Sequence, residues 1–174
     1  MNGVKLCRQR DTLTHPPGDF FNDGRDDVKK AFATKSAGKP VIGYSGTPLA
    51  KKLGIADGSH VLPIAAPDDY VDMLAPLPND VRFEKRSGPG IDLAHVFADR
   101  RSELHKHLVA LRAKLRADAA IWVSWPKNAA RVSTDITEDT IREVALPLGF
   151  VDIKVCAVSA VWSGLKLVVR KELR

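Results

Sequence analysis

From Gly43 onward, short apolar stretches alternate with polar stretches that carry turn and helix signals. The run IDLAHVFA at 91–98 is almost wholly apolar, which is typical of a strand buried on both faces of a parallel sheet. A second run, 60–66, contains Pro63 and therefore predicts an edge strand or a bulge. Further strands are predicted at four places, namely 81–85, 119–125, 151–158 and 165–171.

Helix signals lie between these strands. Leucines recur along 99–116 at the spacing of one helical face, which predicts the longest helix. Three shorter helices are predicted from capping and stop signals: Thr47 and Pro48 to Gly54, a helix opened by Asp68 or Asp69, and a helix capped by Thr137 and stopped by Pro147 and Gly149.

The order of these elements predicts an α/β fold with a mainly parallel sheet, because strands and helices alternate. No helix separates the last two strands, so they must form a C-terminal antiparallel pair. In the strand 151–158 the apolar residues alternate, which places Val151, Ile153, Val155 and Ala157 on one side. The whole pattern resembles a small, truncated Rossmann-like fold of the methyltransferase type.

Several blocks of sequence carry a more specific resemblance. The segments GYSGTPLAKKLGI (43–55), WVSWPK (122–127), TEDTIREVALPLGFVDIKVCAV (137–158) and WSGLKLVVR (162–170) follow one another in fixed order. In these blocks the chain resembles the bacterial family known as domain of unknown function 3052 (DUF3052), from Gly43 to Arg174. The resemblance implies a bacterial protein but no activity, and it assigns no catalytic residue.

Composition divides the chain at about residue 40. Residues 1–40 are rich in Pro, Gly, Asp and Lys and have no apolar period, which predicts a poorly ordered tail before a single α/β domain at 41–174. A short helix around 26–34, within this tail, is an alternative to a tail without any regular structure. Because no Met lies between Met1 and Met73, a non-Met start near Val41 is another interpretation of the tail.

Charge and apolar content bear on location and partners. The net charge of +6 is shared equally between 1–40 and the rest, so the domain itself shows no basic groove, and nucleic-acid binding is the least favoured function. Arg and His residues form a band beside the leucine stripe of the long helix. The band needs no binding partner to explain it, because the aliphatic parts of basic side chains commonly lie along the rim of an apolar stripe with their charged ends in water. No apolar run reaches the roughly 20 residues of a membrane span, and no signal peptide is readable. We expect a cytoplasmic protein.

Signals for common chemistry are weak. Cys7 and Cys156 stand far apart without a CxxC pair, and His105 and His107 point to different sides of a helix, so neither a disulfide nor a metal site is predicted. The segment GTPLAKKLG lacks the order of a phosphate-binding loop. Ser124 has no GxSxG context for a nucleophile. His95 lies in a buried run and is interpreted as a hydrogen-bonded core residue.

A methyltransferase places a glycine-rich turn after its first strand, where backbone N–H groups approach S-adenosylmethionine. Here that segment is IAAPDDY at 64–70, which has no glycine, and its aspartates would repel the methionine carboxylate. Glu84, near the end of the second predicted strand, is a candidate for a ribose-binding acid.

Open α/β sheets bind ligands at the carboxyl ends of their strands. By this rule the candidate ligand-binding residues are Ser124, Trp125 and Lys127, which end the strand IWVSW, together with Pro67 and Asp68 if the two strands are neighbours. Structural packing of the tryptophans is the competing interpretation. Trp122 and Ser124 are predicted to face one side of the sheet, and Ile121 and Val123 the other.

Three functional hypotheses follow. The first is a Rossmann-like binding or regulatory module without cofactor chemistry of its own, whose partner is an unidentified small molecule or protein. The second is a divergent S-adenosylmethionine-dependent methyltransferase-like enzyme. The third is weak nucleic-acid binding. No specific cofactor and no catalytic residue is predicted.

Overall fold

The computed structural model describes residues 46–174, and the expectations for the tail and for a helix at 26–34 lie outside these residues. The described elements run in the order α2 (Leu49–Leu53), β1 (His60–Ile64), α3 (Tyr70–Leu74), β2 (Arg82–Phe83), β3 (Leu93–Phe97), α4 (Arg101–Lys114), β4 (Ala120–Pro126), η1 (Asn128–Ala130), α5 (Glu138–Ala145), β5 (Phe150–Ala157), β6 (Trp162–Val169) and η2 (Lys171–Leu173). Each element falls within a residue or a few of its prediction. The last strand, however, ends at Val169 and is followed by a short 3-10 helix.

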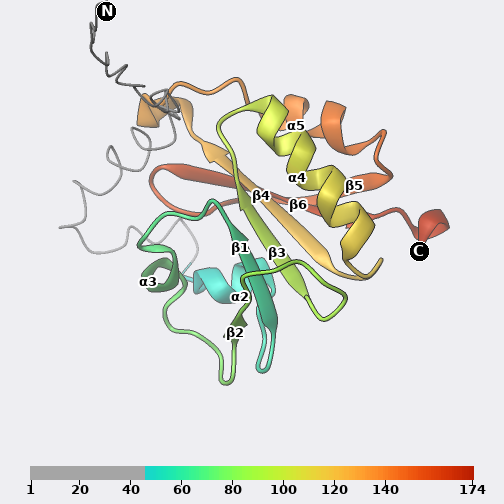
Figure 1. The fold of residues 1–174 in the computed structure, drawn as a ribbon. Coiled ribbons are helices and arrows are strands. Elements are labelled where there is room, and N and C mark those ends of the chain that lie inside the picture. Colours follow the sequence, from blue (N-terminus) through green and yellow to red (C-terminus); the bar gives the residue numbers. More distant parts are fainter. Residues whose placement is uncertain (1–45) are drawn as a thin grey trace, which may run out of the picture.

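The strands form one six-stranded sheet in the order β2-β1-β3-β4-β6-β5 (Figure 1). Strands β2, β1, β3 and β4 are parallel to one another, whereas β6 is antiparallel to both of its neighbours, β4 and β5. The prediction of a methyltransferase-like Rossmann fold with an antiparallel pair at its end is confirmed. Since β1, β3 and β4 run the same way, their carboxyl ends share one edge of the sheet.

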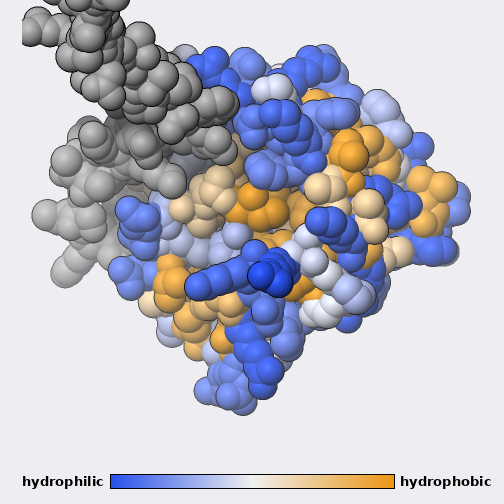
Figure 2. Space-filling model, in the orientation of Figure 1, coloured by the Kyte–Doolittle hydropathy of each residue, from blue (hydrophilic) through white to orange (hydrophobic). Residues whose placement is uncertain are grey.

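Helices α4 and α5 cover one face of the sheet (Figure 1). From α4, Leu104, Leu108 and Leu111 are fully buried there, as the leucine spacing predicts. They pack with Val123 of β4, which lies on the same core. The outer surface of this side is largely hydrophilic, with apolar residues gathered in smaller groups (Figure 2).

The short helices α2 and α3 cover the opposite face. Their buried residues, Leu53 and Leu74 among them, pack against Trp122, whose side chain is fully buried. The indole Nε1 of Trp122 donates a hydrogen bond of 2.8 Å to the backbone oxygen of Leu53. This bond supplies a partner for the one polar atom of a large core side chain and ties α2 to the centre of the sheet.

Pro63 lies within β1, which is not an edge strand, and the structure shows why this is tolerated. The backbone oxygen of Val61 accepts from Glu84 on the β2 side, so Pro63, two residues on, turns its nitrogen to the same side. Strand β2 has already ended at Phe83. The missing N–H of Pro63 therefore costs no ladder hydrogen bond.

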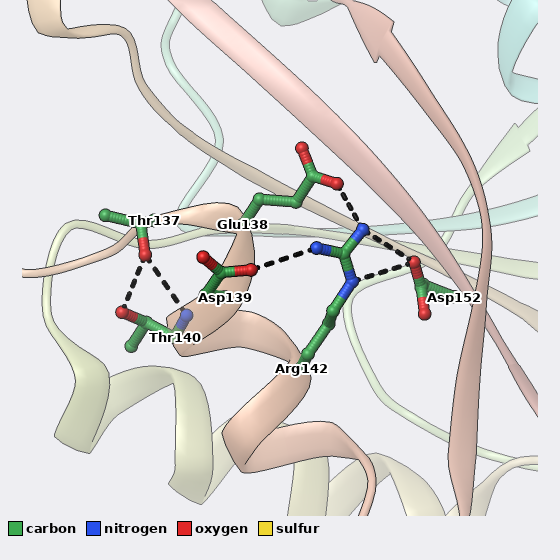
Figure 3. A network of polar contacts seen from close by, with 6 residues as sticks. All are labelled: Thr137, Glu138, Asp139, Thr140, Arg142 and Asp152. Carbon is green, nitrogen blue, oxygen red and sulfur yellow. Dashed lines mark hydrogen bonds and ion pairs between the residues drawn. The ribbon is translucent and has the colours of Figure 1, made fainter.

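The predicted cap of α5 is present. The hydroxyl of Thr137 accepts from the backbone N–H of Thr140 at 3.1 Å (Figure 3). In the same view the guanidinium of Arg142 contacts the carboxylates of Glu138, Asp139 and Asp152. Because Asp152 belongs to β5, these ion pairs join the helix to the outermost strand of the sheet.

Two local predictions are wrong. Pro48, not Thr47, is the residue that precedes α2, although Gly54 ends the helix in the left-handed conformation as expected, at φ 87°. In β5, a bulge between Asp152 and Lys154 breaks the alternation. Val151 pairs with Val168 and Val155 pairs with Leu165, and partners three residues apart on β6 lie on opposite faces of the sheet.

Among the described residues, no helix combines the length and the apolar character required to cross a membrane.

Candidate functional site at the carboxyl edge of the sheet

The edge formed by the carboxyl ends of β1, β3 and β4 carries three short connections. The turn 65–69 follows β1, Ala98 and Asp99 follow β3, and Lys127 follows β4. The first two connections lead to helices on opposite faces of the sheet. Helix α3 follows the turn after β1 and lies on one face, and α4 follows β3 and lies on the other. In open α/β sheets this edge is where ligands bind, so its side chains are the first place to look for chemistry.

The turn 65–69 has an unusual backbone. Ala65 adopts φ 51°, a left-handed conformation that favours glycine, and it is exposed to solvent. The N–H of Tyr70 donates to the oxygen of Pro67 at 3.0 Å and starts α3. Within the described chain, no hydrogen bond is formed by the N–H groups of Ala65 and Ala66. The turn thus offers backbone donors without containing a glycine.

Directly beneath this edge, three polar side chains form a buried chain of hydrogen bonds. The hydroxyl of Tyr70 lies 3.0 Å from Nδ1 of His95, and Nε2 of His95 lies 2.7 Å from Oγ of Ser124. The three residues come from α3, β3 and β4, so the chain crosses from helix to sheet. His95 and Ser124 have no exposed surface. The imidazole also stacks on the ring of Phe97, with ring centroids 4.4 Å apart.

Burial sets the protonation states in this chain. Desolvation lowers the pKa of His95 to about 3, so the imidazole is neutral at pH 7. The same cause raises the pKa of Tyr70, and its phenol stays protonated. No buried side-chain polar atom of the described residues lacks a hydrogen-bond partner. The two hydrogen bonds and the complete burial of His95 fit its interpretation as a core residue. The hydroxyl of Ser124 is also fully buried, so a substrate cannot reach it.

The candidate residues at the end of β4 have structural partners. Ser124 lies in the buried chain just described, and Trp125 retains only 9% of its surface, packed in the core under α4 and α5. The Nζ atom of Lys127 donates 2.6 Å to the backbone oxygen of Ser159, in the turn between β5 and β6. Lys127 is half-buried, so of these three residues it alone retains more than a small exposed surface.

The other two candidates lie in the turn after β1. Pro67 is half-buried and Asp68 is exposed. Strand β3 separates β1 from β4, so the two groups of candidates are not on neighbouring strands. The sequence-based hypothesis placed the two groups on neighbouring strands, and this condition is not met, because β3 lies between them.

Glu84 does not reach this edge. Its carboxylate lies 3.0 Å from Nδ1 of His60, which is the first residue of β1. The residue pairs 60 with 82 and 61 with 83 place Glu84 beside Leu62, so about three residues, or roughly 10 Å, separate it from Ala65. In this conformation Glu84 is not placed to bind a ligand at the turn.

Asp99 is a candidate that sequence reasoning missed. It follows β3 at the centre of the edge and is half-buried. Its backbone oxygen accepts from Thr134 Oγ1 at 2.9 Å and from the N–H of Asp135 at 3.2 Å. No hydrogen bond or ion pair involves its carboxylate within the described chain. In the sequence, Asp99 was interpreted only as the beginning of a helix, and its position after a buried strand was the available signal.

A groove of about 650 Å³ opens between the first half of α4 and the end of α5, and Asp99 is not among its lining residues. Its lining includes Arg101, His105, Asp135 and Glu143. Arg101 and Glu143 form an ion pair at 2.7 Å, so the charges of the groove largely compensate one another.

Metal and thiol chemistry find no support among residues 46–174. No group of three His, Cys, Asp or Glu side chains there could hold a metal ion. Cys156 is half-buried on β5, and burial raises the pKa of its thiol although the nearby lysines act in the opposite direction. A raised pKa keeps the thiol protonated, which disfavours it as a nucleophile.

Two solved structures with the same fold as this chain are methyltransferases by name. An S-adenosylmethionine-dependent methyltransferase from Aquifex aeolicus matches with a TM-score of 0.51 and 13% identity, over 70% of this chain and 88% of that one. A protein assigned to the type 11 methyltransferases, from Sulfolobus solfataricus, matches with a TM-score of 0.50 and 12% identity, over 71% and 90%. At such identities the likeness shows the fold.

No protein-family model matches the sequence, and no curated protein does. The resemblance to DUF3052 therefore stays a prediction. The leading functional expectation, a module without cofactor chemistry, is corrected by the fold comparisons. They favour the second hypothesis, since the same strand arrangement occurs in proteins named for S-adenosylmethionine-dependent methyl transfer.

Proposed function

We propose that this protein is a divergent methyltransferase-like enzyme that binds S-adenosylmethionine at the carboxyl edge of β1 and β3. The observation that carries the proposal is the strand order, in which antiparallel β6 lies between β4 and β5 at the end of an otherwise parallel sheet. The likeness to two solved methyltransferase folds supports it.

The residues at the edge fit this cofactor in charge and in backbone geometry. S-adenosylmethionine carries a sulfonium and an ammonium group against one carboxylate, so it is a net cation. Asp68 and Asp99 supply negative charge on either side of the edge, and neither carboxylate is tied up by an ion pair within the described chain. The N–H groups of Ala65 and Ala66, which have no hydrogen-bond acceptor in residues 46–174, are the donors available to the carboxylate or to the ribose hydroxyls.

When bound, the cofactor supplies an activated methyl group for transfer to a nucleophilic atom of the substrate. The chain's own contribution is to bind and orient. The left-handed turn at Ala65 lets the backbone approach the ligand, as a glycine would elsewhere. The Tyr70, His95 and Ser124 chain holds α3 against β3 and β4, and so fixes the position at which that turn begins.

Isothermal titration calorimetry with S-adenosylmethionine and with S-adenosylhomocysteine tests this proposal. We expect binding of both, and the change Asp99→Asn should weaken it about 10-fold, the effect of losing one charge-assisted hydrogen bond. Asn keeps the size of the side chain, so the fold is preserved.

Asp72→Asn is the matched control, because Asp72 is exposed on α3 and carries the same charge away from the edge. It should leave both affinities unchanged. An absence of heat from either ligand at about 1 mM, with protein shown to be folded by circular dichroism, would contradict the proposal.

A further inference from the structure

Four lysines gather on the side of the sheet that α2 covers. Lys51 and Lys52 belong to the last turn of α2, while Lys154 and Lys166 come from β5 and β6. We name this set the lysine patch. It lies around the end of α2 and contains none of the residues proposed to bind the cofactor.

The contacts of Lys154 and Lys166 bring their ammonium groups to one place. Lys154 donates from Nζ to the backbone oxygen of Lys52 at 3.2 Å. Nζ of Lys166 lies 3.6 Å from where a Cβ atom would stand on Gly54, the residue that ends α2. Both ammonium groups thus converge on the end of α2, where Lys51 and Lys52 already add positive charge.

This arrangement is unfavourable for the isolated protein. Lys154 and Lys166 are directly opposed in the antiparallel pair of β5 and β6, and like charges in that position repel. None of the four lysines has a carboxylate within 4.0 Å in residues 46–174. An anion bound across the patch would remove the repulsion.

The arginines of α4 and α5 behave differently. Arg101 pairs with Glu143, Arg116 with Asp92, and Arg142 with three carboxylates. Within the basic band of the long helix, Arg101 and Arg116 are thus paired with carboxylates, whereas Arg112 contacts the backbone oxygen of Leu173. The lysine patch instead brings together four cations without a carboxylate partner, from segments that lie about 100 residues apart in sequence.

We propose that the lysine patch binds the phosphodiester backbone of a double-stranded nucleic acid. Several ammonium groups spaced over two strands and a helix end suit a row of phosphates. A duplex is favoured over a single strand because the two tryptophans of this side, Trp122 and Trp162, are buried and not available for stacking on bases. This inference goes beyond the proposed cofactor site and does not depend on it.

Fluorescence anisotropy with the full-length protein and a labelled duplex of about 20 base pairs, as RNA and as DNA of the same sequence, tests the inference. We expect binding at about 50 mM salt that weakens with a logarithmic salt slope near −3 to −4, as four phosphate contacts require. The double change Lys154→Gln and Lys166→Gln should weaken binding about 10-fold.

The matched control is Lys106→Gln with Lys114→Gln, which removes the same charge from the exposed side of α4. Its affinity should stay within about 2-fold of the unchanged protein, since only net charge is altered. Tighter binding of one duplex would support the inference and identify the nucleic acid. No binding of either duplex at about 50 mM salt, or an equal loss in the control, would overturn it.

The two proposals fail separately. The lysine variants should bind S-adenosylmethionine as the unchanged protein does, and Asp99→Asn should bind the duplex normally. Poly-glutamate of matched length provides a last comparison, and competition by it as strong as that of the duplex would also overturn the inference.

Discussion

The two faces of the sheet are built in different ways. Under α4 and α5 the core is apolar, and the polar groups of that side lie outside it in ion pairs such as Arg142 with Asp152. Under α2 and α3 the core contains both fully buried polar side chains of the described chain, His95 and Ser124, and the indole bond of Trp122.

The difference reflects what covers each face. Helix α4 has 14 residues and α5 has 8, enough to present continuous apolar stripes to the sheet. Helices α2 and α3 have only five residues each, and helices this short are not stable alone. Directed hydrogen bonds from Trp122 and His95 hold them in position. The face that needs such bonds is also the face that positions the turn after β1.

The largest expected effect concerns Trp122. Replacing it with Ala removes a fully buried side chain and should lower the free energy of unfolding by about 3 to 5 kcal/mol, measured by urea denaturation. Trp122→Phe sharpens the comparison, since it keeps most of the apolar volume but leaves the oxygen of Leu53 without its partner. We expect that variant to lose about 1 to 3 kcal/mol.

A volume-conserving change on the other face is its control. Leu108→Met, under α4, should cost less than about 1.5 kcal/mol because no polar atom loses a partner. Equal losses for Trp122→Phe and Leu108→Met would show that the two faces are not held differently.

The second effect is a dependence of stability on pH. The native state keeps His95 neutral down to its pKa of about 3, whereas the unfolded chain binds a proton near pH 6.5. Between these values the unfolded state holds the extra proton. Stability therefore rises with pH across this window and is lost as pH falls from 6.5 toward 3, at about 1.4 kcal/mol per pH unit. Urea denaturation between pH 4 and pH 8 measures the slope.

Removing the imidazole identifies its source. His95→Gln retains a donor and an acceptor but cannot titrate, so the slope between pH 4 and pH 6 should become shallower. His105→Gln, on the exposed side of α4, should keep the slope of the unchanged protein. A slope that survives His95→Gln would assign the effect to other groups.

The smallest effect tests the lysine patch. Lys154→Glu turns the opposed pair with Lys166 into an attractive one, so it should raise the free energy of unfolding by roughly 0.2 to 1 kcal/mol. Thermal unfolding at low and at high salt measures the gain, which salt should reduce. A loss of stability would show that the contact of Lys154 with α2 outweighs the repulsion between the lysines.

Much of the fold is predictable because it rests on local patterns. The leucines of α4, the apolar run of β3 and the Thr137 cap each depend on residues close in sequence, and each is present as expected. Predictions fail where the decisive partner is distant. The bulge in β5 depends on pairing with β6, and the tolerance of Pro63 depends on where β2 ends.

The candidate site divides in the same way. The sequence could place Ser124, Trp125, Lys127, Pro67 and Asp68 at strand ends, since that follows from strand boundaries alone. It could not show that Trp125 turns into the core or that Lys127 holds the turn at Ser159. Nor could it show that Glu84 pairs with His60 and so lies away from the edge.

The sequence by itself determined the order of strands and helices, the antiparallel end of the sheet and the buried character of His95, because these follow from periodicity and hydrophobicity. Only the tertiary structure decided which charges are neutralised, that Tyr70 and Ser124 are the partners of His95, and that Lys154 meets Lys166. Hydrogen bonds and ion pairs act over a few ångströms in space, whereas Tyr70 and Ser124 are 25 and 29 positions away from His95 along the chain. Folding alone brings them together.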